Sequence, residues 1–223
     1  MAVADASHAF PARLLVVADR DYVGDDERWL ALLGEVAAAA VGRPVAIQVR
    51  AKSASRVDFA ALAARARDVV PRNVLLLLNG DTALAERLGY AGVHWPEADI
   101  PATRPPHPIA FRSAAAHSLD AARRARAAGA DVAVFGAVNA PGSHPGEGMG
   151  LDALREVTQD AGLPVIAIGG IQPEHVADCI EAGAVGVAVV SGILGAANIE
   201  AAAGCYLEAI EEAIDASMER ARS

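Results

Sequence analysis

Glycine and serine residues follow two apolar runs near the end of the sequence, at positions suited to holding an anion. The run Val165–Ile168 continues into a Gly-Gly pair, and the run Val185–Val190 continues into a Ser-Gly pair. Because glycine has no Cβ, backbone N–H groups can approach an anion closely there, and a helix that begins just beyond adds a favourable dipole. The alternative is that these glycines only make tight turns. The residues that we predict to bind a phosphate are Gly169, Gly170, Val190, Ser191 and Gly192.

A second candidate for anion binding is a set of polar side chains at every other position. Gln48, Arg50 and Lys52 alternate with Val49 and Ala51. Side chains two residues apart lie on one face of a β-strand, so all three would point the same way. If that face lies inward, an arginine fork beside a lysine point charge is able to hold a diphosphate. If it lies outward, the three side chains are only solvated.

Short apolar runs alternate with longer amphipathic segments along most of the chain, and these elements must position the polar residues. Such alternation is typical of a parallel sheet with helical crossovers. The segment Pro96–Pro108 carries five prolines and is predicted to be a loop or one short turn of helix. The predicted strands are Leu14–Ala18, Val45–Val49, Val74–Leu78, Gly92–Trp95, Ile109–Arg112, Val132–Phe135, Val165–Ile168 and Val185–Val190. The predicted helices are Glu27–Val41, Asp58–Val70, Thr82–Leu88, Leu119–Ala128, Leu151–Ala161, Glu174–Ala182 and Glu200–Met218.

Eight such strands could form a doubly wound open sheet or close into a barrel. An open sheet that binds a dinucleotide carries a glycine fingerprint after its first strand, whereas Asp19-Arg20-Asp21 follows the first strand here. The glycines follow the last two strands instead, which is where barrels of this kind bind phosphate. We therefore predict an α/β fold, a (β/α)8 TIM barrel, with residues 1–12 as an N-terminal extension and residues 13–223 as a single barrel domain.

The composition limits the partners of this barrel. The 223 residues are 53% hydrophobic, only 4% aromatic, and carry a formal charge of −9. A negative charge argues against a nucleic-acid surface, which needs a broad basic patch, but a few basic side chains can still bind a phosphorylated small molecule. No apolar stretch approaches about 18 residues and no signal peptide is evident, so we expect a cytoplasmic protein without a membrane partner. Cys179 and Cys205 are expected to be small core residues, and an alanine-rich helix face could pair subunits into a homo-oligomer.

The segments Pro164–Ile171 and Ala182–Ser191 strongly resemble the thiamine phosphate synthase and TenI superfamily, and the resemblance extends over about Arg13 to Ala197. It implies that the two glycine loops hold the phosphate of a thiazole substrate. The pattern at Gln48, Arg50 and Lys52 is similar to the strand with which these synthases bind pyrophosphate, and all three residues are present. Residues 78–81 and 143–146 further resemble a synthase-like domain that is fused to some Nudix hydrolases.

The same resemblance implies a magnesium ion between two aspartates, which follow the third and fourth predicted strands. At the first position Asn79 matches the family, but Gly80 occupies the place of the aspartate. Asp81 could reach the ion from one residue later, or it could cap the helix that begins next to it. At the second position Asp99 is present, and Glu97 could add an oxygen ligand. Magnesium commonly needs one or two carboxylates together with substrate phosphate and water, so we predict Asp99 and Asp81 as its ligands.

Three further positions depart from the family pattern. Ala115 stands where the family has a serine that contacts the pyrimidine, and Ser113 could substitute if the loop shifts. Ser143-His144 stands where the synthases have a Thr-Lys pair that grips pyrophosphate, and a mostly uncharged histidine is a weaker clamp. Ala137 stands where TenI tautomerases have a histidine, and alanine cannot transfer a proton.

The leading hypothesis is a transferase of thiamine biosynthesis, which joins a hydroxymethylpyrimidine diphosphate to a thiazole phosphate and releases pyrophosphate. The resemblance implies a pyrimidine cation, so the protein would mainly position the reactants and stabilise the departing charge. The alternatives are a TenI-like thiazole tautomerase, with His117 or His144 as the base, and a non-catalytic phosphate-binding barrel. We expect His94 to be a buried, hydrogen-bonded residue. Under the leading hypothesis the catalytic residues are Arg50, Lys52 and His144, and Gln48, Asn79, Ser113 and Ser143 contact substrate.

Overall fold

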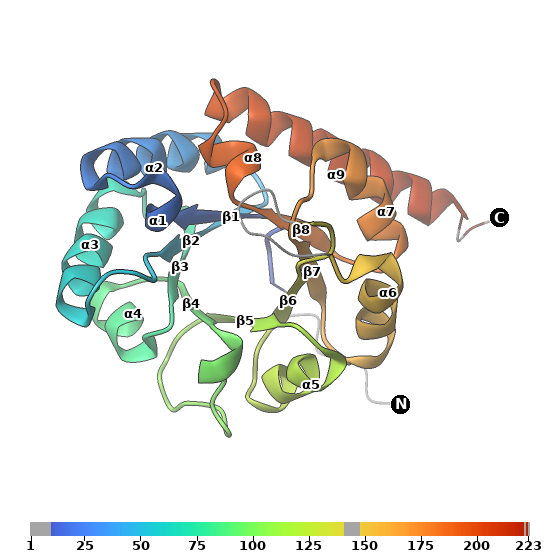
Figure 1. Cartoon of the computed structure of the whole chain (residues 1–223), viewed down its shortest axis with the longest axis horizontal. Helices are drawn as coiled ribbons and strands as arrows, with labels where there is room; N and C mark the ends of the chain where they lie inside the picture. Colours follow the sequence, from blue (N-terminus) through green and yellow to red (C-terminus); the bar gives the residue numbers. More distant parts are fainter. Residues whose placement is uncertain (1–9, 141–147, 221, 223) are drawn as a thin grey trace.

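The computed structural model describes residues 10–140, 148–220 and 222, and these residues form a closed barrel of eight parallel strands (Figure 1). Each strand pairs with the next one along the chain, and β8 closes the barrel on β1. The predicted TIM barrel is confirmed, and the open sheet is excluded. The strands are β1 (Leu14–Asp19), β2 (Val45–Arg50), β3 (Leu75–Asn79), β4 (Gly92–Trp95), β5 (Phe111–Ala116), β6 (Val132–Gly136), β7 (Val165–Ile168) and β8 (Gly186–Val189).

Helices on the outside of the barrel connect most strands, in the order that the amphipathic segments predict (Figure 1). Short polar side chains fix where several of them begin; the hydroxyls of Ser55 and Ser118 accept backbone N–H groups of the first turns of α3 and α5. The proline-rich connection after β4 contains only the 3₁₀ turn η2 (Glu97–Asp99), as predicted. The helices are α1 (Arg20–Val23), α2 (Asp26–Ala40), α3 (Arg56–Val69), α4 (Thr82–Leu88), α5 (Leu119–Ala127), α6 (Gly150–Asp160), the 3₁₀ turn η3 (Pro173–His175), α7 (Val176–Glu181), α8 (Ser191–Leu194) and α9 (Ile199–Arg220).

The core has two parts, because successive strand side chains point alternately outward and inward. Outward side chains pack beneath the helices. Phe10 and Phe111 meet edge to face inside the barrel, with ring centroids 6.0 Å apart. Small and aliphatic side chains fill the interior above them, so polar inward residues are left to the C-terminal ends of the strands. The buried inward residues include Leu15, Ala46, Leu77, Val132, Val134, Ile166 and Ala188.

Two details of the sequence prediction are wrong. The fifth strand was expected at Ile109–Arg112, but β5 runs over Phe111–Ala116. Its second half is a run of alanines, which carries no β-branched signal and is extended only because it pairs with β4 and β6. Cys179 is buried as expected, whereas Cys205 is exposed on α9 and is not a core residue.

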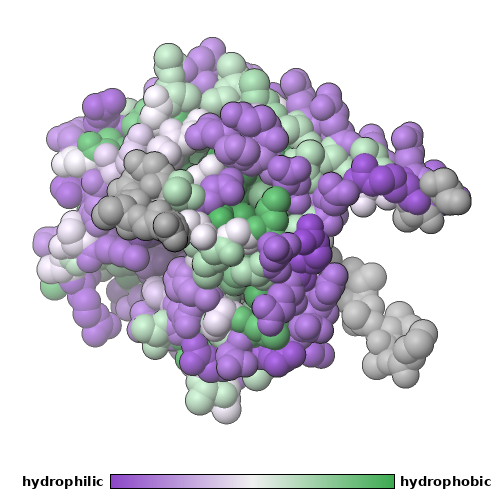
Figure 2. All heavy atoms as spheres, turned by 45° about the vertical axis from the view of Figure 1, so that its right-hand side comes forward, coloured by the Kyte–Doolittle hydropathy of each residue, from purple (hydrophilic) through white to green (hydrophobic). Residues whose placement is uncertain are grey.

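The surface offers no sign of a broad apolar partner face on the side that Figure 2 displays. With the right-hand side of Figure 1 turned forward, the described residues there are mainly hydrophilic; strongly hydrophobic residues are most concentrated near the centre of the view, and weakly hydrophobic ones are scattered over its upper part. Within the described ranges, no helix combines the length and the hydropathy needed to cross a membrane.

Candidate active site

Polar side chains from five neighbouring strands meet at the C-terminal mouth of the barrel. The parallel register places Asp19 beside Arg50, and it places Asn79, His94 and then Ser113 side by side on the next three strands. Asp19, Arg50 and Asn79 lie two or four residues after a buried inward side chain of their own strand, so they face inward too. His94 pairs with Asn79 across the strands, and Ser113 pairs with His94, so both face the same interior. Parallel pairing thus gathers into one belt residues that are almost 100 positions apart in the sequence.

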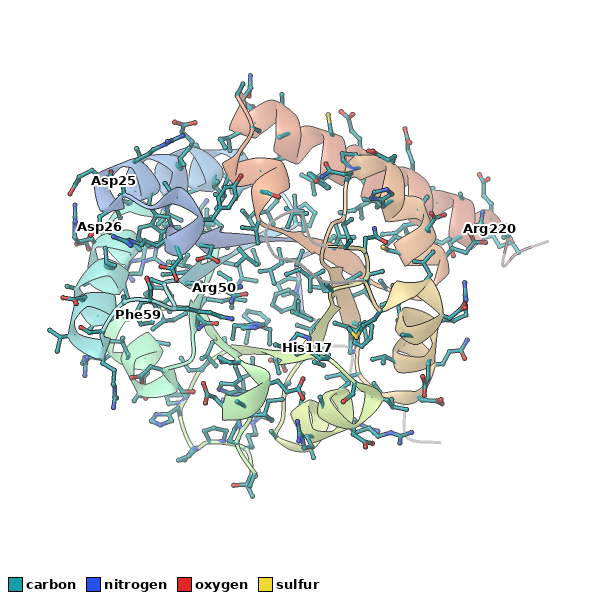
Figure 3. All side chains as sticks on the ribbon, viewed as in Figure 1. Asp25, Asp26, Arg50, Phe59, His117 and Arg220 are labelled. Atoms are coloured by element: carbon teal, nitrogen blue, oxygen red, sulfur yellow. The ribbon has the colours of Figure 1, made fainter. Side chains whose placement is uncertain are left out.

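Arg50 is the cation of this belt. Its side chain is 19% exposed, and its Nε lies 3.5 Å from Oδ2 of Asp19. This Nε is buried and makes no hydrogen bond with any described residue. Figure 3 shows Arg50 inside the ring of strands, on the side of β2. Because Nε is buried and faces Asp19, the two terminal nitrogens of the guanidinium are the ones that could meet an anion in the mouth.

Gln48 lies one step deeper on the same strand and is 3% exposed. Its Nε2 donates to Oδ1 of Asn79 over 3.1 Å, so the amide groups of β2 and β3 orient each other. The outward alternative for Gln48 and Arg50 is excluded. Lys52 differs, because it lies beyond the strand end in an exposed loop.

A carboxylate holds the loop that carries Lys52. Asp21, from α1, accepts the backbone N–H of Ser53 over 2.9 Å and also accepts the Ser53 hydroxyl. Partial burial works to raise the pKa of Asp21, but the hydrogen bonds from Ser53 outweigh it and hold the pKa below its ordinary value. Asp21 is therefore ionised at neutral pH and ties the loop after β2 to the loop after β1.

His94 is buried and hydrogen-bonded, as expected. Its Nδ1 lies 2.9 Å from Oγ of Ser113. Burial, with the nearby charges of Arg50 and Lys52, lowers the pKa of His94 to about 3, so the ring is neutral in the folded protein. Ser113 itself has no exposed surface. Its hydroxyl is hydrogen-bonded to His94, and it lies one layer deeper in the barrel than Ala115. Ser113 therefore does not replace the serine that the family has at position 115 for contact with the pyrimidine.

The carboxylates predicted near magnesium have different surroundings. Oδ1 of Asp81 caps α4 by accepting the Leu84 N–H over 2.9 Å, and its Oδ2 lies 3.4 Å from Arg56. The capping alternative for Asp81 is confirmed. Asp99, in η2, is exposed. The part of the chain that the structure describes contains no group of three or more His, Cys, Asp or Glu residues arranged to hold a metal ion.

Glu97 is not a free oxygen ligand, because other residues occupy both of its carboxylate oxygens. Oε2 accepts the backbone N–H of His117 over 2.8 Å, and Oε1 accepts from Arg124 over 3.2 Å. His117 in turn donates from Nδ1 to the carbonyl of Gly136 at the end of β6. Figure 3 shows His117 within the ring of strands, on the side of β5 and β6. Glu97 thus joins the η2 turn to the loop after β5.

The predicted phosphate loops lie at the same mouth, after β7 and β8. Gly169 and Gly170 adopt φ values of +105° and +59°, which disfavour any other residue. A Cβ on Gly169 would also lie 2.5 Å from Cα of Ala137. Val190 directly precedes α8, and Ser191 and Gly192 begin it. The N–H groups at the very start of a helix have no partner within the helix itself. Ser143 and His144 lie outside the described residues.

Sequence reasoning missed two of the groups that organise this site. Asp19 ends β1 next to Arg50. Because the C-terminal ends of barrel strands form the active site, its position at a strand end could have predicted it as a site residue. The role of Glu97 as a bridge had no local signal, because its partners His117 and Arg124 lie 20 and 27 residues away.

A closed parallel barrel with a polar belt that holds an arginine at one part of its mouth, and with glycine loops after its last two strands, is typical of TIM-barrel enzymes that act on phosphorylated small molecules. The comparison with known families narrows this class. The chain belongs to the thiamine monophosphate synthase family, whose model matches residues 14–193.

Individual relatives agree with this assignment. The chain is 35% identical over 214 residues to a thiamine-phosphate synthase of Roseiflexus, covering 93% of this chain and 88% of the relative. It is 42% identical over 157 residues to the thiamine biosynthesis bifunctional protein ThiM/ThiE of Symbiobacterium thermophilum, a match that spans 68% of this chain but only 33% of that protein. The thiamine phosphate pyrophosphorylase of Pyrococcus furiosus shares the fold, with a TM-score of 0.74 at 24% identity over 92% of this chain and 98% of that one. The predicted family and the predicted enzyme class, a thiamine-phosphate-synthase-type transferase, are confirmed.

Proposed function

We propose that this chain condenses a hydroxymethylpyrimidine diphosphate with a thiazole phosphate at the C-terminal mouth of its barrel. The observation that carries the proposal is the presence of two anion-binding regions at one mouth. The first is Arg50 at the end of β2, together with Lys52 in the exposed loop that follows it. The second consists of the glycine loops after β7 and β8.

In this arrangement the two regions divide the charges of the reactants. Arg50 and Lys52 bind the diphosphate, and Gln48 with Asn79 supplies amide groups beside it. The bond from the pyrimidine methylene carbon to the diphosphate oxygen breaks, and a bond from that carbon to the thiazole nitrogen forms. The cationic side chains stabilise the pyrophosphate that departs, so they act more strongly in the transition state than in the bound substrate. The thiazole phosphate lies against Gly169, Gly170, Val190, Ser191 and Gly192, and Ser143 and His144 would complete the grip on pyrophosphate.

Magnesium belongs to this proposal through one carboxylate. Asp99 is exposed and fits an ion that takes its other ligands from diphosphate and water. Asp81 fits less well, because it already caps α4 and lies near Arg56. When bound, the ion neutralises charge on the leaving pyrophosphate. Arg50 and Lys52 supply positive charge to the same pyrophosphate from the protein itself.

The experiment is to incubate the purified protein with both substrates and Mg²⁺ and to measure thiamine phosphate and pyrophosphate. Equal amounts of both products are expected from the wild type, and Lys52→Ala should be strongly impaired. No turnover above the Lys52→Ala variant would contradict the proposal. Thiamine phosphate binding by calorimetry without turnover would favour the non-catalytic barrel, and proton exchange on a thiazole carboxylate phosphate without any pyrimidine would favour the tautomerase.

A further inference from the structure

A buried tyrosine on the last helix contacts both loops of the phosphate region. Tyr206 lies on α9 and is 1% exposed. Its hydroxyl donates to the backbone carbonyl of Ile171 over 3.0 Å, and Ile171 directly follows Gly169 and Gly170. A buried hydroxyl that has an acceptor is a strong constraint, because losing the bond leaves a polar group unsatisfied. Tyr206 therefore ties α9 to the loop after β7.

The same hydroxyl explains why residue 192 is a glycine. The backbone of Gly192 lies outside the left-handed region, so its conformation does not require glycine. A Cβ at this position would overlap the Tyr206 hydroxyl, and the next nearest atom would be Cζ of the same ring, at 3.1 Å. The first turn of α8 can approach α9 so closely only because residue 192 has no side chain. One oxygen atom therefore lies against the loop after β7 and the loop after β8.

We propose that Tyr206 is a positioning residue, whose hydroxyl sets the spacing between the two halves of the phosphate region for the thiazole phosphate. This inference rests on the proposed function, which assigns that substrate to these loops. Tyr206 does not contact the reacting atoms, and it lies beyond residues 14–193, the part of the chain that the family model matches. Burial, with the nearby charge of Glu174, raises the pKa of Tyr206 to about 12, so the hydroxyl keeps its proton at any pH at which the enzyme would work.

The chain provides a matched control for a test of this role. Tyr90 is also buried, and its hydroxyl donates to the backbone carbonyl of Ala63 over 2.8 Å. Tyr90 precedes β4 and its acceptor lies on α3, far around the barrel from β7 and β8. Tyr206→Phe and Tyr90→Phe each remove one buried hydroxyl and its hydrogen bond to a backbone carbonyl. A general effect on stability should therefore be similar in the two variants.

The first measurement is the KM of each substrate in the two variants. Tyr206→Phe should raise the KM for thiazole phosphate about 5- to 10-fold, the effect expected for one lost hydrogen bond that orders a binding loop. The KM for the pyrimidine diphosphate should stay within about twofold of wild type, because Arg50 and Lys52 are not affected. Tyr90→Phe should change neither KM beyond about twofold. Thermal midpoints of both variants show whether stability changes equally.

The second measurement uses the contact between Tyr206 and Gly192. Gly192→Ala should weaken thiazole phosphate binding, because the added methyl group overlaps the tyrosine hydroxyl. Removing that hydroxyl relieves the overlap, so Gly192→Ala combined with Tyr206→Phe should bind thiazole phosphate about threefold or more better than Gly192→Ala alone. A role of Tyr206 in stability alone predicts that the double variant regains thermal stability relative to Gly192→Ala but shows no improvement in thiazole phosphate binding.

The outcomes separate this inference from the function on which it rests. If the wild type turns over and Tyr206→Phe matches Tyr90→Phe in both KM values, the inference on Tyr206 is wrong and the proposed function stands. If the wild type neither turns over nor binds thiazole phosphate in calorimetry, the proposed function fails, and the inference fails with it. A selective rise in the thiazole phosphate KM, together with rescue in the double variant, supports both.

Discussion

Oδ2 of Asp19 lies 3.5 Å from Nε of Arg50, across the pairing of β1 with β2. Oδ1 of the same carboxylate accepts the Asp21 N–H and caps α1, so Asp19 cannot move without loosening the first loop of the barrel. The pair is mostly buried, with side chains 12% and 19% exposed, and ion pairs in such surroundings are screened less than those on the surface. Asp19 thus holds the base of the guanidinium and leaves its far N–H groups for an anion.

Replacing Arg50 tests whether its planar fork is required. Arg50→Lys should lower kcat/KM for the pyrimidine diphosphate about 10- to 100-fold, because lysine keeps the charge but loses the paired donors. Arg65→Ala is the control, since Arg65 of α3 forms an exposed ion pair with Glu27 of α2 and does not belong to the belt of inward-facing residues. Steady-state kinetics of both variants would decide the point. Wild-type kinetics for Arg50→Lys would show that the guanidinium does not bind the diphosphate.

Gly169 tests the backbone requirement of the phosphate loop. Gly169→Ala should lower the free energy of unfolding by about 1–3 kcal/mol, because its φ of +105° disfavours alanine and the methyl group would meet Ala137. It should also weaken thiazole phosphate binding. Gly204→Ala is the matched control; it lies within α9 with nothing near its added Cβ, so it should stabilise the protein by about 0.5–1 kcal/mol. Urea titrations measure both, and an unchanged unfolding midpoint for Gly169→Ala would contradict the expected strain.

Sequence alone was sufficient for the barrel and for part of its mouth, because both follow from local patterns. Period-two alternation predicted that Gln48 and Arg50 share one face of β2, and the structure shows that this face points inward, whereas the glycine pairs already marked the ends of β7 and β8. Sequence was insufficient wherever one residue depends on a distant one. The alanines of β5 are extended only through their neighbours, and Tyr206 reaches Ile171 across 35 positions. No periodicity in a single sequence reports such contacts.

Asp81 and Asp99 can be distinguished by the effect of each on stability and on magnesium. Asparagine caps helices about as well as aspartate, so Asp81→Asn should keep wild-type stability, whereas Asp81→Ala should lose about 1 kcal/mol. Neither should change the Mg²⁺ concentration needed for half-maximal activity by more than about twofold. Asp99→Asn should raise that concentration about tenfold or more, since it removes a charged oxygen ligand. A large rise for Asp81→Asn with none for Asp99→Asn would reverse the assignment.

His94 makes the stability of the barrel depend on pH. Its pKa is lowered to about 3 in the folded protein, chiefly by burial, whereas the pKa of an unfolded histidine is about 6.5. Between these values the unfolded chain binds a proton that the folded chain does not, so stability falls as the pH falls from about 6.5 toward 3. From pH 7 to pH 5 this histidine alone should lower the free energy of unfolding by roughly 2 kcal/mol. His94→Gln should lose this component, because glutamine cannot be protonated but can still bond Ser113. Urea midpoints of the wild type and of His94→Gln are compared at pH 7 and at pH 5, so that the contribution of His94 is separated from that of other titrating groups. If the midpoints of the two proteins fall by the same amount between these pH values, the ring already takes up a proton in the folded barrel.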